Sequence, residues 1–184
     1  MALFTVSELI GIVVLTIYLG YLFSGITIRR PGLDKKDFIF SILIAAPAVI
    51  LHEFAHKFTA MAFGIPAVFH VFYEDLFTLI LAGVSVLLKA IGSPIIFLIP
   101  GFVSIPSSIT PPQSGLISFA GPFINLMLWI GSGLYLKYGK RLTRKKMIFL
   151  FVTKRVNMIL FLFNMIPFYP LDGEKVLNAL FSLF

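Results

Sequence analysis

Long apolar segments are the feature that most constrains the fold of this chain. Residues 9–28, 38–64, 116–136 and 147–166 each run for about 20 residues or more, nearly all apolar or small. A helix of about 20 such residues is long enough to cross the hydrocarbon core of a bilayer. Residues 76–91 are equally apolar but number only about 16, so they form either a short crossing or a tilted, partly buried helix.

Composition agrees with a lipid environment. Of 184 residues, 59% are hydrophobic and 12% are charged, and a soluble domain of this size could not bury so much apolar surface. The net charge of +7 is carried in short loops without interleaved aromatic residues, so no nucleic-acid partner is expected. The absence of cysteine excludes disulfides and thiolate metal sites.

Two further segments favour strands over helices. Residues 65–73 are aromatic and β-branched, and residues 95–105 are similar, with Pro100 and Gly101 forming a turn between two short strands. Backbone of this kind is tolerated at membrane depth only where protein or a wet cavity covers it. The fold class predicted is an all-α polytopic membrane protein with about five to six transmembrane helices and a small membrane-associated β-strand region.

The most informative motif is His52-Glu53-x-x-His56, which lies within the apolar segment 38–64. Two histidines four residues apart on a helix differ by about 40° around the axis and lie ~6 Å apart along it. Both imidazoles therefore face one space, as two ligands of a tetrahedral zinc ion would, with Glu53 beside them to handle the proton of a bound water. Ionisable groups inside an apolar span are costly and usually mark function. His70 is an alternative ligand, but a lone histidine among apolar neighbours more often has a structural role.

A second polar stretch follows the last long apolar segment. Pro167 and Pro170 each remove a helical amide donor, which predicts an unwound segment between Asn164 and Asp172. A short helix can resume over residues 174–184.

Three further segments complete the prediction. Asn125, a side-chain amide in the apolar segment 116–136, needs a hydrogen-bond partner. Residues 107–114, which contain two prolines, are predicted to form a surface loop. Residues 137–146 hold six basic side chains and are expected to face lipid headgroups.

Together, the histidine motif, Gly121-Pro122-x-x-Asn125 and Asn164-x-x-Pro167-x-x-Pro170-Leu-Asp172-Gly173 resemble the site-2 protease family of intramembrane zinc metalloproteases. The resemblance spans roughly residues 38–180 and is closest to archaeal members. It departs at Tyr169, where many members have proline.

The resemblance implies that His52, His56 and Asp172 hold one zinc ion and that Glu53 is the catalytic base. It also implies that Asn164, and with it Asn125, binds substrate, and that residues 95–105 border an extended substrate strand. Two imidazoles and one carboxylate leave zinc one open position, the pattern of a catalytic site. The substrates implied are single-span membrane proteins cut within or near their helices, as in regulated intramembrane proteolysis, with zinc-bound water as the nucleophile.

On this interpretation, residues 1–37 form an anchoring helix and loop, and residues 38–184 form the metalloprotease core, a multi-pass protein of the cell membrane. One alternative is an inactive membrane-protein-binding homologue of the same fold, against which the complete set of ligands and Glu53 argues. The other is a metal transporter, which should place acidic or histidine residues on several helices.

Overall fold

The computed structural model of the chain describes residues 3–25, 34–93, 101–106 and 108–184. It contains two compact units. The first comprises Met1–Pro47 and Val68–Ser104, and the second comprises Ala48–Ala67 and Ile105–Phe184. The sequence-based division into residues 1–37 and 38–184 stays a prediction.

The first unit combines helices with a two-stranded sheet. Its elements are α1 (Val6–Phe23), the first part of α2 (Lys35–Ala62), β1 (Val68–Val71), the 3-10 helix η1 (Phe72–Glu74), α3 (Leu76–Ala90) and β2 (Gly101–Ser104). The strands are antiparallel, with Val68 opposite Ser104 and Val71 opposite Gly101. The predicted strands are thus confirmed for β1 and β2, but Gly101, which was expected in a turn, is the first residue of β2 and pairs with Val71. Residues 95–100 lie outside the described part of the chain.

Helix α1 is tied to β1 by a buried carboxylate. Glu8 closes a capping box with Thr5, and its Oε1 atom accepts a hydrogen bond from the backbone N–H of Phe69 at 2.7 Å. Gly11, one turn further along, leaves room for the strand, because a Cβ atom there would lie 2.5 Å from Val71 Cγ2. Glu8 is only 1% exposed, so it serves the contact between helix and strand.

His70 has a local role in this sheet. Its Nδ1 atom lies 2.6 Å from Glu74 Oε2, its Nε2 atom lies 2.9 Å from Ser104 Oγ, and its ring stacks on Phe102. Both ring nitrogens therefore have partners from β2 and η1, which agrees with the structural interpretation of this residue.

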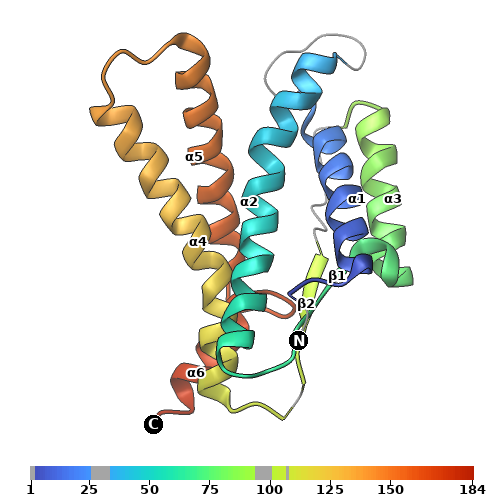
Figure 1. Cartoon of the computed structure of the whole chain (residues 1–184), viewed down its shortest axis with the longest axis vertical. Coiled ribbons are helices and arrows are strands. Elements are labelled where there is room, and N and C mark those ends of the chain that lie inside the picture. The colour runs from blue at the N-terminus through green and yellow to red at the C-terminus, as the bar shows by residue number, and fades with distance from the viewer. Residues whose placement is uncertain (1–2, 26–33, 94–100, 107) are drawn as a thin grey trace. The chain divides into compact units, whose positions relative to one another are not determined.

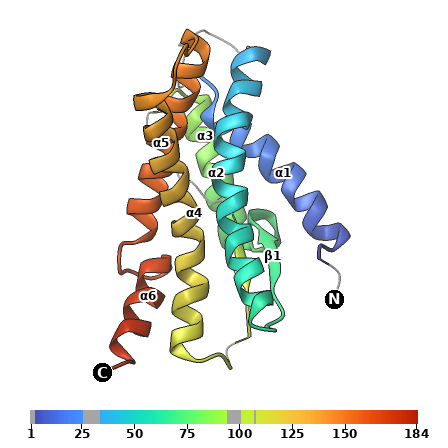
Figure 2. The ribbon, with the colours of Figure 1, turned by 60° about the vertical axis from the view of Figure 1, so that its left-hand side comes forward.

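The second unit is helical. It contains the rest of α2 from Ala48 onward, α4 (Pro111–Tyr138), α5 (Arg144–Asn164) and α6 (Asp172–Phe181). Helix α4 packs against both α5 and α6, as the two views of the ribbon show (Figures 1 and 2). The predicted unwound segment is confirmed, since α5 ends at Asn164 and α6 begins at Asp172.

One sequence-based prediction in this unit is wrong. Residues 107–114 were expected to form a loop, but α4 begins at Pro111. Proline is well tolerated at the first position of a helix, where its missing N–H would have no helical partner. Thr110 caps the helix and forms a capping box with Gln113, so the prolines mark a helix start here and not a loop.

Four of the described helices are long and apolar enough to cross a membrane: α1, α2, α4 and α5. Helix α3 is apolar but has only 15 residues. The helical fold with a small sheet is confirmed over the described residues, and the predicted number of five to six crossings stays a prediction.

Candidate metal centre

The two histidines of the motif converge on one point from α2. His52 and His56 are 6% and 7% exposed, and their Nε2 atoms lie 3.1 Å apart. The spacing of four residues on a regular helix produces this convergence, as the sequence predicted.

Asp172, the first residue of α6, reaches the same point. Its Oδ2 atom lies 3.2 Å from His52 Nε2 and 3.3 Å from His56 Nε2. Asp172 therefore contributes a carboxylate oxygen to the cluster.

Gly173 allows this approach of α6. A Cβ atom at position 173 would lie 2.5 Å from the backbone carbonyl of Met165 and 2.6 Å from that of Ile166. Backbone atoms cannot move aside as a flexible side chain can, so a larger residue would push Asp172 away from the histidines.

The hydrogen bonds behind the imidazoles determine which nitrogens carry protons. His52 Nδ1 lies 2.6 Å from Asn125 Oδ1, and His56 Nδ1 lies 2.7 Å from the carbonyl oxygen of Ile117. Both partners are acceptors, so each Nδ1–H donates and each neutral imidazole presents a lone pair at Nε2. Acceptors on the second nitrogen orient metal-binding histidines in the same way.

The cluster therefore brings three electron-pair donors close together. Because their lone pairs repel one another, a cation bound between them would stabilise the arrangement. His52, His56 and Asp172 form a group that could hold a metal ion among the described residues. Tetrahedral zinc, at 2.0–2.2 Å from nitrogen and oxygen ligands, implies ligand-to-ligand distances of about 3.3–3.5 Å. The observed 3.1, 3.2 and 3.3 Å lie close to those values, so the residues fit zinc and leave a fourth position open.

Gly121 of α4 faces the same point. A Cβ atom there would lie 2.4 Å from His56 Nε2 and 2.7 Å from His52 Nε2. Gly121 thus lets α4 come close to the two imidazole side chains. The missing side chain leaves open the space beside both donor nitrogens.

Glu53 follows His52 directly and is 5% exposed. It interacts electrostatically with His52, with Asp172 and with Lys175 of α6. A buried carboxylate next to His52 in the chain, but outside the group of three donors, is a candidate proton acceptor. Its catalytic role stays a prediction.

Asn125 is fully buried, and both the oxygen and the nitrogen of its side-chain amide form hydrogen bonds. Besides accepting from His52, it donates through Nδ2 to the carbonyl of Ala48 at 3.0 Å and to Asn157 Oδ1 at 2.9 Å. The two donor bonds orient the amide, so its oxygen faces His52. Asn125 is thus a positioning residue for His52, and its predicted role in substrate binding stays a prediction.

Asn164 lies apart from these contacts. It is half-buried at the end of α5, and its Nδ2 atom donates to the carbonyl of Leu160 at 3.0 Å. That bond leaves the amide oxygen as an acceptor, and the predicted role of Asn164 in substrate binding stays a prediction.

We expect Asn125→Leu to weaken metal binding by about 10–100-fold, because it removes the acceptor that orients His52. Metal titration of the purified variant measures this. Asn157→Leu is the graded comparison: it removes one of the two bonds that orient the Asn125 amide but leaves the acceptor itself, so metal binding should weaken less. If Asn125→Leu binds metal as tightly as the unmodified protein and only raises KM, Asn125 binds substrate and does not position His52.

Three contributors to the centre were not predicted from sequence. The backbone carbonyl of Ile117 carries no sequence signal at all. Asn157 could have been found, because a second amide in an apolar helix also needs a partner. Lys175 lies three residues after Asp172 and so shares its side of α6, but a lysine near a helix start resembles any surface charge.

Comparisons with known proteins agree with this chemistry. The chain is 29% identical over 176 residues to a Methanocaldococcus jannaschii protein named "Putative zinc metalloprotease", covering 95% of this chain and 85% of that protein. It is 27% identical over 145 residues to a Synechocystis protein with the same name, covering 77% of this chain and 31% of that protein. No protein-family model matches the chain, and neither does any solved structure. The chain is therefore similar, over nearly its whole length, to a protein named for zinc-dependent proteolysis.

Proposed function

We propose that this protein is an intramembrane zinc metalloprotease of the site-2 protease type, which hydrolyses peptide bonds within or near the transmembrane helices of single-span proteins. The observation that carries the proposal is the convergence of His52, His56 and Asp172, with Glu53 buried next to them. Four helices that can cross a membrane, one of which carries both histidines, support a site within the bilayer of the cell membrane.

Each residue has a defined part in the reaction. His52, His56 and Asp172 would hold zinc, which when bound lowers the pKa of a water and polarises the scissile carbonyl. Glu53 accepts a proton from the water as its oxygen bonds to the carbonyl carbon. It then donates that proton to the amide nitrogen as the carbon–nitrogen bond breaks, so an acid and an amine leave.

The turn between α5 and α6 fits the need for water at membrane depth. Its two prolines leave carbonyl groups without helical donors, and such backbone is stable in a bilayer only where it lines a wet or protein-covered space. A substrate peptide bond must also leave its helix before it can react, because helical hydrogen bonds shield the amide.

The metal assignment is tested on the purified protein. We expect about one zinc ion per chain and a marked loss in His52→Ala, His56→Ala and Asp172→Ala, each of which removes one of the three donors. Elemental analysis measures the content. Unchanged zinc in all three variants would show that the metal lies elsewhere.

The protease assignment is tested by incubating the protein in detergent with a panel of single-span helices, with and without a zinc chelator. We expect cleavage that the chelator stops and added zinc restores. Tight binding of helices without any cleavage by zinc-loaded protein would favour the inactive homologue.

A further inference from the structure

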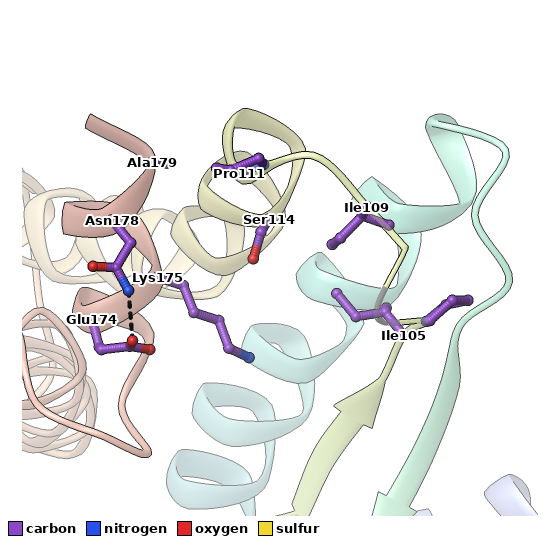
Figure 3. Close-up of a pocket in the computed structure, with 9 residues that line it drawn as sticks. Ile105, Ile109, Pro111, Ser114, Glu174, Lys175, Asn178 and Ala179 are labelled. Atoms are coloured by element: carbon purple, nitrogen blue, oxygen red, sulfur yellow. Dashed lines mark hydrogen bonds between the residues drawn. The ribbon is translucent and has the colours of Figure 1, made fainter. Parts of the chain in front are cut away.

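A pocket of about 410 Å³ opens between α4, α6 and the segment that leads into α4 (Figure 3). We call it the α4–α6 pocket. A volume of this size is within the range of pockets that bind small molecules or short peptide segments. No part of the reaction described above uses it.

The pocket has two unlike walls. Ile105, Ile109 and Pro111 supply an apolar wall on one side. Figure 3 shows the side chains of Glu174, Lys175 and Asn178 on α6 across from them. The α4–α6 pocket is therefore suited to a ligand that is apolar on one side and polar on the other.

Lys175 provides the positive charge on the polar wall. Glu174 Oε1 accepts a hydrogen bond from Asn178 Nδ2 at 2.6 Å, which holds that carboxylate against its own helix. Lys175 is the cationic side chain among the residues that line the pocket. An acidic group on a ligand would find its partner there, and a carboxylate in apolar surroundings needs one.

The α4–α6 pocket adjoins the candidate metal centre along two helices. Lys175 comes three residues after Asp172, about 4.5 Å along α6, and Figure 3 shows its side chain extending from α6 toward α2. Its charge interacts electrostatically with Glu53 of α2. Ser114, another lining residue, comes seven residues before Gly121 and so lies on the same side of α4, about 10 Å away.

We propose that the α4–α6 pocket binds the substrate chain two to three residues from the scissile bond and recognises an acidic side chain there through Lys175. Extended peptide advances about 3.3 Å per residue, so two to three residues cover the distance from the metal centre. Successive side chains point in opposite directions, so the residue next to the acidic one faces Ile105 and Ile109. This inference rests on the proposed protease function and adds a sequence preference to it.

The test is a charge exchange between enzyme and substrate. Single-span substrates carry Glu, Gln or Lys at each position up to four residues from the cleavage site. For the unmodified protein we expect kcat/KM to be highest with Glu at one position two or three residues away, by about ten- to a hundredfold over Gln, as for a hydrogen bond between charged groups. Lys175→Glu should reverse the preference, so that Lys at that position becomes the best substrate.

The controls separate this proposal from simpler explanations. Lys145→Glu makes the same charge change on an exposed residue of α5, and it should keep the unmodified order of substrates. Zinc content is measured in every variant. If Lys175→Glu slows all substrates equally, with no reversal, the α4–α6 pocket does not recognise an acidic residue.

A second measurement does not depend on turnover. In Glu53→Gln, a photoreactive residue in place of Ile109 should cross-link the substrate residue next to the acidic position. Cross-links spread evenly along the substrate, or none, would overturn the assignment of the α4–α6 pocket. The proposed protease function would stand in both cases, because it depends only on cleavage by the unmodified protein.

Discussion

Replacing Glu53 with glutamine is expected to abolish peptide cleavage while zinc content and folding stay near those of the unmodified protein. Glutamine keeps the shape of the side chain but cannot accept the proton of the attacking water. A general base contributes about 10²–10⁴-fold, and Glu53 is the buried carboxylate next to the donor cluster that is not one of the three donors. Single-turnover cleavage of a helical substrate in detergent measures the loss.

Asp34→Asn is the matched control for this experiment. It makes the same carboxylate-to-amide change just before the start of α2, away from the histidine motif. Cleavage by this variant should be unchanged. If Glu53→Gln cleaves at close to the unmodified rate, the metalloprotease mechanism given above is wrong, whatever metal the protein holds.

The second large effect is expected from a single methyl group at Gly121. In Gly121→Ala, the new Cβ atom would lie within 2.4–2.7 Å of the donor nitrogens of both histidines. A zinc ion would sit 2.0–2.1 Å from the same nitrogens, so the methyl group and the metal compete for one space. We expect zinc affinity to fall by at least about a hundredfold, the upper end of the effect of removing a hydrogen-bond partner of a metal ligand. Cleavage should be lost with the zinc.

A loss of zinc in Gly121→Ala is not expected to come from a less stable α4. Alanine favours helices over glycine by about 1 kcal/mol, so Gly121→Ala should not weaken α4 through its backbone. Gly131→Ala is the control on the same helix, because a Cβ atom there meets nothing within 4 Å. Retention of both zinc and cleavage by Gly121→Ala would mean that the metal is not held between His52 and His56.

Much of the metal centre was predictable because its signals are local. The spacing of His52 and His56 depends only on helix geometry, and the helix itself follows from an apolar segment of bilayer length. The break between Asn164 and Asp172 follows from two prolines whose effect on the backbone does not depend on distant residues. Resemblance to a known family then suggested that Asp172 joins the histidines, which composition and spacing do not show.

The start of α4 shows where local rules give the wrong answer. Proline interrupts a helix in its interior but is favoured at its first residue, so the same dipeptide is compatible with a loop or with a helix start. The Thr110–Gln113 capping box was the deciding signal, and it was present in the sequence.

The sequence by itself determined the chemistry of the donors, the helices that carry them and the lipid environment around them. Only the tertiary structure decided how close they come and what orients them. Gly121 lets α4 come close to the two imidazoles, and Gly173 lets α6 come close to the carbonyls of Met165 and Ile166. The pattern of apolar residues along one helix does not encode how closely another helix packs against it. The acceptor behind His56 is the backbone carbonyl of Ile117, which every residue type possesses, so its role follows from the position of α4 and not from the identity of a side chain.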